Sequence, residues 1–179
     1  REYAEEEEAY REGPLPELWI HEETKESEKA LISRVNFFVS VLGYEPENLA
    51  VLTPFDKQVD RFIKLLSAEG YDIRDVRKKN FDFSSSKGIR VSTLHSAKGV
   101  EFPVVMLYIP RLFYPVYQAR KISEQRNFNL IYVAMTRAMD NLQVFLLKDA
   151  DDQIIDIMKA AYNRLHEKQQ KEDQEIVNG

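Results

Sequence analysis

Short apolar segments alternate with stretches of helical periodicity along this chain, and this alternation constrains the fold most. Apolar residues recur every three or four positions from Ser27 to Leu42, which indicates one helix face, ended by Gly43. A second such stretch follows Thr53-Pro54, a pair suited to capping a helix, and stops near Gly70. Strands are expected at the short segments Leu49–Leu52, Ile89–Leu94, Val104–Ile109 and Leu142–Leu147, and another short strand is expected to begin at Tyr71–Ile73. Runs that are apolar on both faces and separated by helices predict an α/β fold, a parallel sheet with helices on both faces.

The two ends of the chain differ in composition from its middle. Residues 1–17 form an acidic N-terminal segment and residues 166–179 form a charged C-terminal tail. The residues between them, 18–165, are enough for one domain with a buried core. Within this domain we also expect a helix from about Glu124 to Ala138. A final amphipathic helix is predicted to carry Ile154, Ile157, Met158, Ala161 and Leu165.

Composition excludes several classes of protein. The chain has no cysteine, which rules out disulfides, thiol catalysis and thiolate metal sites, and its 3 histidines are too scattered for a metal site. Its apolar runs are too short to cross a bilayer and no secretory signal is recognisable, so we expect a cytoplasmic protein without a membrane partner. The formal net charge of −5 is not that of a free-standing nucleic-acid binder. Any anion must therefore be bound locally.

A polar stretch, TLHSAKGVE at residues 93–101, ends the run Ile89–Leu94. It is expected at the carboxyl end of a strand, where parallel sheets bind ligands. There Lys98 offers a point charge to a phosphate, Gly99 lets backbone amides approach, and Glu101 can accept from ribose hydroxyls. Thr93 and His95 hold alternate strand positions and can face a second phosphate backbone. The residues alone leave open a surface ion pair between Lys98 and Glu101 and a structural role for His95.

A second stretch, NLIYVAMTRAMDNL at residues 129–142, gives the first its context. In order, TLHSAKGVEFPVV and NLIYVAMTRAMDNL closely resemble motifs V and VI of the UvrD/Rep/PcrA group of superfamily 1 DNA helicases. Two long motifs in the correct order are a specific match, whereas SAKG or TRA alone would be weak. Residues 47–73 also resemble the strand-helix-strand unit that opens the second motor domain of that family. The resemblance spans about Leu18 to Leu147.

The resemblance implies a fold and a role for each motif residue. The chain would be the second RecA-like motor domain (2A) of an ATP-dependent DNA helicase, with ATP and Mg²⁺ in the cleft against the N-terminal RecA-like domain. Lys98 and Gly99 would lie at the γ-phosphate side and Glu101 at the ribose. Arg137 would be the catalytic arginine that stabilises the transferring phosphoryl group, because phosphoryl transfer depends on positioned charge. The residues that would contact the backbone of single-stranded DNA are Thr93 and His95.

Parts of the family pattern are missing from these residues. There is no GxxxxGK[ST] phosphate loop and no acidic magnesium motif, so we expect this chain not to hydrolyse ATP alone and Mg²⁺ to be held mainly by the N-terminal motor domain. Nothing in residues 1–17 resembles motif IV of the family. The residues between Val76 and Ile89 are too few for the 2B subdomain that UvrD, Rep and PcrA insert ahead of motif V. We therefore expect a C-terminal helicase fragment without 2B.

Other interpretations of the same residues stay open. A domain whose parent has lost motor function would be a non-catalytic module for nucleic-acid or protein interaction. An enzyme that acts on RNA, or on DNA for an attached nuclease or repair partner, would use the same backbone contacts. Arg137 itself has an alternative role as a cation at the C-terminus of a helix, where the helix dipole favours positive charge.

Overall fold

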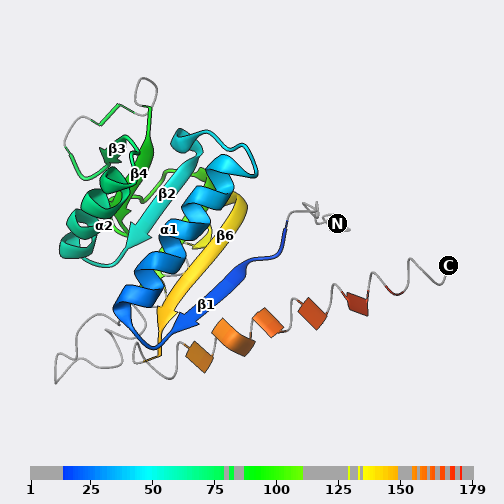
Figure 1. Cartoon of the computed structure of the whole chain (residues 1–179). Helices are drawn as coiled ribbons and strands as arrows, with labels where there is room; N and C mark the ends of the chain where they lie inside the picture. The colour runs from blue at the N-terminus through cyan, green and yellow to red at the C-terminus, as the bar shows by residue number, and fades with distance from the viewer. Residues whose placement is uncertain are drawn as a thin grey trace, which may run out of the picture.

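A parallel sheet of six strands forms the centre of the described part of the protein (Figure 1). The computed structural model describes residues 14–78, 81–82, 87–110, 129, 133, 135–148 and single positions between 155 and 174. The strand order is β1-β6-β5-β2-β4-β3, and every neighbouring pair is parallel. The strands are β1 (Glu17–His21), β2 (Leu49–Thr53), β3 (Ile73–Asp75), β4 (Ile89–Thr93), β5 (Phe102–Ile109) and β6 (Ala138–Leu147). The predicted parallel α/β sheet is confirmed.

Two helices cover one face of the sheet. They are α1 (Thr24–Ser40) and α2 (Asp56–Ala68), and both lie in front of the strands in Figure 1. The side chains that they bury on the sheet are Leu31, Val35, Phe38, Val59, Phe62 and Leu66. Arg61 of α2 forms two hydrogen bonds with the carboxylate of the buried Glu28 in α1, at 3.1 and 2.9 Å, which joins the two helices. The helical spacing seen in the sequence therefore does face a sheet.

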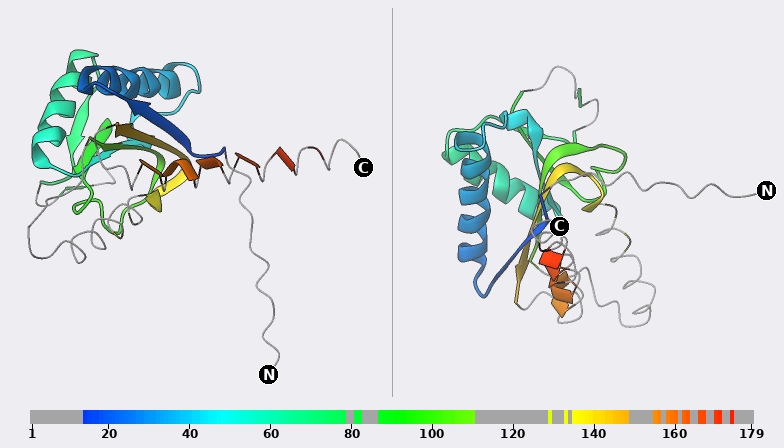
Figure 2. Two further views of the ribbon diagram at one scale, coloured as in Figure 1. Left: turned by 90° about the horizontal axis from the view of Figure 1, so that it is seen from below. Right: turned by 90° about the vertical axis from the view of Figure 1, so that its right-hand side faces the viewer.

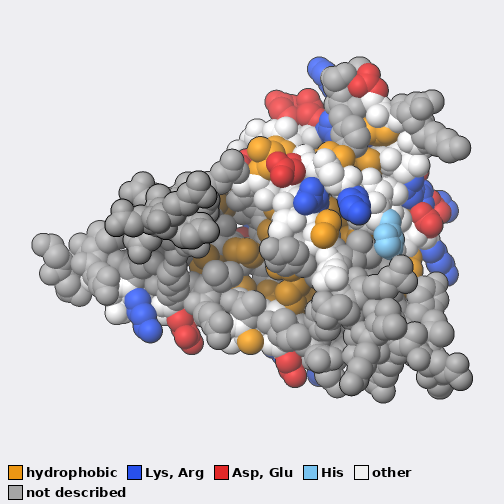
Figure 3. Space-filling model, turned by 180° about the vertical axis from the view of Figure 1, so that it is seen from behind, with side chains coloured by type: hydrophobic (Ala, Val, Ile, Leu, Met, Phe, Trp, Pro, Cys, Tyr) orange, Lys and Arg blue, Asp and Glu red, His pale blue; other side chains and the backbone are white. Residues whose placement is uncertain are grey.

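The opposite face of the sheet is covered by the chain between β4 and β5 and by the C-terminal helical residues (Figure 2). Leu94 and Ala97 come from the first of these segments, and Ile155 and Met158 from the second. They pack on strand residues that include Ala50, Leu52, Val105, Leu107, Val144 and Leu146. Figure 3 shows hydrophobic side chains gathered at the centre of this face. No helix in the described residues is long and apolar enough to cross a membrane.

The structure corrects four details of the expected elements. β1 was not predicted, because it is a half-buried edge strand without clear alternation. β6 begins at Ala138 rather than at Leu142, since Ala138 pairs with Phe102 of β5. Phe55, with an extended backbone, is the N-cap of α2, so the expected Thr53-Pro54 cap is wrong and Thr53 is the last residue of β2. In the final helix, Ile155 is buried on the sheet, although it was not among the predicted apolar positions. Most of the helix expected over residues 124–138 lies outside the described residues.

Candidate nucleotide and nucleic-acid site

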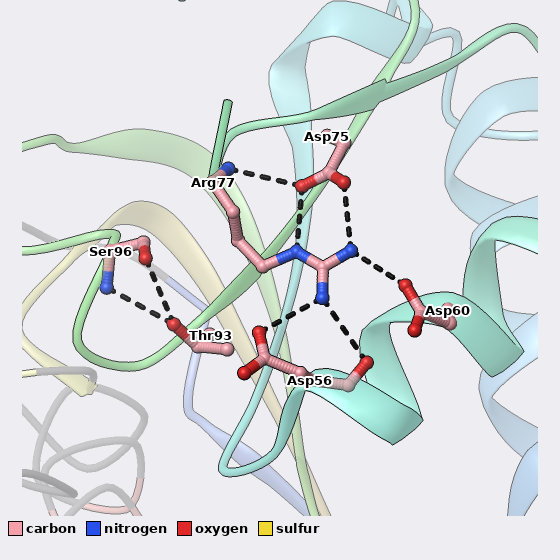
Figure 4. Close-up of polar contacts among 6 residues, drawn as sticks. All are labelled: Asp56, Asp60, Asp75, Arg77, Thr93 and Ser96. Atoms are coloured by element: carbon pink, nitrogen blue, oxygen red, sulfur yellow. Dashed lines mark hydrogen bonds and ion pairs between the residues drawn. The ribbon is translucent and has the colours of Figure 1, made fainter. Parts of the chain in front are cut away.

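Thr93 ends β4 and caps the turn that follows it. The hydroxyl oxygen of Thr93 accepts a hydrogen bond from the Ser96 amide at 3.2 Å, and the hydroxyl donates to Ser96 Oγ at 3.0 Å (Figure 4). The carbonyl of Thr93 accepts from the Ala97 amide at 3.2 Å, which closes a helical turn. A Thr that bonds the amide three residues later has the geometry of an N-cap. Its hydroxyl is therefore engaged inside the turn.

His95 lies in this turn and not in the strand. Because β4 stops at Thr93, strand alternation does not place the two side chains on one face, and that step of the sequence argument is wrong. The His95 side chain is exposed and has no hydrogen-bond partner among the described residues. The imidazole is accessible to a ligand, which is what the predicted contact with a phosphate backbone requires.

The chain then crosses the sheet face and turns at Gly99. Leu94 and Ala97 are buried on that face, whereas Lys98 and Gly99 are exposed. Gly99 has a φ of +85°, a left-handed conformation that side chains other than Gly rarely adopt. A Cβ added to Gly99 would meet no atom within 4 Å. Gly is therefore required here by backbone conformation, and the space beside it is open.

One backbone hydrogen bond brings the two motif segments together. The Phe102 amide donates to the Arg137 carbonyl at 2.8 Å, so Glu101 and Arg137 flank the point where β5 and β6 begin. One step further, the register between β5 and β6 shifts at Phe102 to Val104, because β6 holds an extra residue there. Such bulges are common beside functional sites, where they redirect the chain. The structure thus places Glu101 beside Arg137 in the fold, 36 positions apart in the sequence.

These residues lie at opposite ends of the strands, which are the carboxyl edge and the amino edge of the sheet. Thr93 is the partner of Thr53 at the carboxyl end of β2, level with Tyr108 near the carboxyl end of β5. Glu101 directly precedes Phe102, the first residue of β5, which lies six residues before that level, or about 20 Å at the usual rise per strand residue. The expectation that the whole polar stretch lies at the carboxyl edge is therefore wrong. It holds for Thr93, but the chain carries Glu101 back to the amino edge.

The Arg137 side chain is folded back on the turn before it. Its Nε donates to the Val133 carbonyl at 3.0 Å and its Nη2 donates to Thr136 Oγ1 at 3.3 Å. The Thr136 hydroxyl in turn donates to the same Val133 carbonyl at 2.8 Å. A guanidinium carries five N–H groups, and the described residues provide no partner for the other three of Arg137. The Arg137 side chain is therefore oriented by the turn, and its remaining N–H groups are available to a ligand.

Lys98 and Glu101 are both exposed and do not bond to each other. The described structure contains no ion pair between them, so the surface pair that the sequence left open is not formed. Both charged groups remain available to a ligand. Among the described residues, no three acidic or histidine side chains are grouped so that they could hold a metal ion.

Comparison with known proteins connects this geometry to a family. The UvrD-like helicase C-terminal domain matches residues 18–149. The chain belongs to this family. A solved structure, the C-terminal domain of a possible DNA helicase from Lactobacillus plantarum WCFS1, is similar in fold with a TM-score of 0.58 and 19% identity, covering 79% of this chain and 80% of that one. The RecA-like fold is thereby confirmed. No curated protein matches the chain.

The UvrD-like domain also contains an arginine cluster that the sequence did not reveal. The guanidinium of Arg77, just after β3, bonds Asp75 twice, at 2.9 and 2.7 Å, and Asp60 at 2.6 Å. It also bonds the carboxylate of Asp56 at 2.9 Å and its carbonyl at 3.3 Å. Figure 4 shows this cluster next to the turn of Thr93 and Ser96. It fixes the first turn of α2 to the end of β3 beside that turn.

Three sets of contacts in this UvrD-like domain differ in how far the sequence could have predicted them. The spacing from Thr93 to Ser96 is that of an N-cap, so a search for caps would have found it. The bond from Thr136 to Val133 follows an equally local spacing, but a helical pattern does not show that the hydroxyl also accepts from Arg137. The cluster of Arg77 joins residues up to 21 positions apart and has no local signal.

Proposed function

We propose that this domain supplies half of an ATP site and part of a single-stranded DNA track in an ATP-dependent UvrD-like DNA helicase or translocase. The observation that carries the proposal is the backbone bond from Phe102 to Arg137, which brings the segments of motifs V and VI together. Membership of the UvrD-like family supports a motor role for the parent protein. The phosphate loop and most of the Mg²⁺ ligands would come from the N-terminal RecA-like domain.

The chemistry of Lys98, Glu101 and Arg137 suits a nucleotide. Glu101 offers an exposed carboxylate to ribose hydroxyls, and Lys98 an exposed cation to the γ-phosphate side. Arg137 has three N–H groups without a described partner for the charge that develops on the transferring phosphoryl group. The open space at Gly99 lets a ligand approach the backbone. Closure of the N-terminal domain on this edge would complete the site, and hydrolysis would reopen it.

The turn after β4 suits a nucleic-acid backbone. His95 is exposed there, and the Thr93 hydroxyl, which donates to Ser96 Oγ at 3.0 Å, can donate to a phosphate oxygen instead. Because this turn lies about 20 Å from the nucleotide edge along the strands, a nucleic acid and a nucleotide can bind at the same time. A local track also agrees with the net charge of −5, since the rest of the surface need not be basic.

The arginine assignment is tested by ATP hydrolysis in the full-length protein that carries this domain. Arg137→Ala should lower the DNA-stimulated kcat by at least about a hundredfold, because a donor to the developing charge is lost. Lys98→Ala should depress the same activity. Lys64→Ala, which removes an exposed lysine from α2, is the control and should leave the rate unchanged.

Hydrolysis that survives Arg137→Ala at the wild-type rate would contradict the proposal. A full-length protein that binds single-stranded DNA but hydrolyses no ATP, with or without the substitution, would instead support the non-catalytic interaction module.

A further inference from the structure

We infer that Thr136 is a positioning residue for Arg137: its hydroxyl holds the guanidinium in the orientation in which it meets the nucleotide. This inference rests on the proposed function of Arg137 and adds a residue to it. The motif places the two side chains next to each other in sequence, but only the hydrogen bonds of the folded chain give Thr136 a role.

Val133, Thr136 and Arg137 form a closed ring of three hydrogen bonds. Thr136 Oγ1 donates its proton to the Val133 carbonyl at 2.8 Å, and this fixes where the lone pairs of the oxygen point. Arg137 Nη2 donates to that oxygen at 3.3 Å and Arg137 Nε donates to the Val133 carbonyl at 3.0 Å. The guanidinium is thus attached at two of its donors to two acceptors that are themselves linked. Neither acceptor alone would fix the rotation of the planar group.

The backbone of Arg137 is held independently of this ring. Its carbonyl accepts from the Phe102 amide at 2.8 Å, in the pairing that begins β5 and β6. Loss of the Thr136 hydroxyl would therefore leave the main chain of Arg137 in place and release only the side chain. Thr136 is exposed and packs in neither hydrophobic core, so its substitution should not disturb folding.

The orientation of Arg137 affects the free energy of its contact with a nucleotide, because a free arginine side chain has much rotational freedom to lose. An unrestrained arginine loses that freedom when it binds, whereas one already held by its neighbours does not. In a reaction that depends on positioned charge, the gain appears in the rate of the chemical step rather than in the binding of ATP. The ring leaves three N–H groups of Arg137 for that purpose.

The first test measures the side chain directly in this chain, without ATP or a partner domain. Solvent exchange of the Arg137 Nε–H is followed by NMR in the wild type, in Thr136→Val, which keeps the shape without the hydroxyl, and in Thr136→Ser, which restores it. Exchange should become at least about threefold faster in Thr136→Val and return in Thr136→Ser. The Nε–H of Arg34, bonded to Gln143 at 3.2 Å, is the internal control and should not change. Equal exchange of Arg137 in all three proteins would overturn the inference.

The second test uses the full-length protein and separates this inference from the proposed function. Thr136→Val should lower the DNA-stimulated kcat about three- to tenfold, as expected for one hydrogen bond, with little change in the KM for ATP. Thr136→Ser should restore kcat, and Thr136→Val added to Arg137→Ala should cause no further loss. If Arg137→Ala is impaired but Thr136→Val is not, the positioning role is overturned and the proposed function stands. If Arg137→Ala has no effect, the proposed function itself fails.

Discussion

Two arginines of this domain differ in how fully their N–H groups are bonded. All five N–H groups of Arg77 have an acceptor, from Asp56, Asp60 and Asp75. These carboxylates raise the pKa of Arg77 above its ordinary value, and the hydrogen bonds from Arg77 lower the pKa of Asp75. Within the described part of the chain, Arg137 has two donors engaged. At the scale of the residue, a saturated guanidinium indicates a structural role and an unsaturated one indicates a place for a ligand.

The lowered pKa of Asp75 predicts an acid-sensitive contribution to stability. A carboxylate whose pKa is lower in the folded chain stabilises the fold above its unfolded pKa of about 3.9, and this contribution is lost as the pH falls through the folded pKa. Asp75→Asn should therefore lower the free energy of unfolding by about 1–2 kcal/mol at pH 7. Urea unfolding measured from pH 7 down to pH 3 should show the difference from wild type shrinking below about pH 4.

Asp72 provides the matched control for this measurement, because its side chain is exposed and three residues away. Asp72→Asn should change stability little at any pH. A destabilisation by Asp75→Asn that stayed constant down to pH 3 would show that the ion pair with Arg77 is not its cause.

At the scale of the element, the pairing of β3 with β4 depends on a close backbone approach. Gly88 has a φ of +111°, and a Cβ there would lie 2.5 Å from the Asp72 carbonyl oxygen. That oxygen accepts the hydrogen bond from the Ile89 amide at 2.9 Å, which begins β4. A side chain at Gly88 would therefore push the two strands apart where their pairing starts.

Gly88→Ala should consequently destabilise the domain by at least about 2 kcal/mol, from both the left-handed backbone and the clash. Gly43→Ala is the control, because Gly43 has a φ of +74° but no atom within 4 Å of an added Cβ. The control should lose only the smaller conformational part, about 1 kcal/mol. Thermal unfolding of both variants measures the difference, and equal losses would show that the approach to Asp72 is not limiting.

The elements that the sequence predicted well are those with strong internal patterns. α1 and α2 have apolar residues at helical spacing, β2 and β5 are mainly apolar, and β4 is buried along its whole length although Arg90, Ser92 and Thr93 are polar. β1 could not be foreseen, because Trp19 and its neighbours are half-buried at a sheet edge and are held by distant groups. The Trp19 indole donates to the Gln143 side chain at 2.8 Å, and Arg34 lies over the Trp19 ring. Such contacts are set by the fold and have no local pattern.

The layout of the candidate site could not be predicted from the sequence, and the roles of its residues stay predictions. The motifs point to Lys98, Glu101 and Arg137, and the structure brings Glu101 next to Arg137 through the start of β5 and β6. Strand patterns could not show that eight residues after Thr93 the chain has returned to the opposite edge. The connection from β4 to β5 is this short and contains no regular helix. Parallel strands are usually connected by a dozen or more residues.

At the scale of the whole molecule, the acidic balance predicts weak and local electrostatic binding of nucleic acid. With a net charge of −5 and few exposed cations at the turn of His95, only one or two phosphates should be neutralised by this domain. The affinity for a single-stranded oligothymidylate should then fall with salt at a log–log slope of about −1, since each phosphate contributes about −0.7. Fluorescence anisotropy at several salt concentrations measures this slope. A slope steeper than about −4 would show a broad basic surface and contradict the local track.

The hydrogen bond from Phe102 to Arg137 is made by peptide groups alone. Replacing any side chain at position 137, apart from one that distorts the main chain, leaves this rung of the ladder intact. Substitutions at that position therefore test the chemistry of the side chain without separating β5 from β6. By the same reasoning, substitutions during evolution could remove an activity that depends on the Arg137 side chain and leave the fold intact.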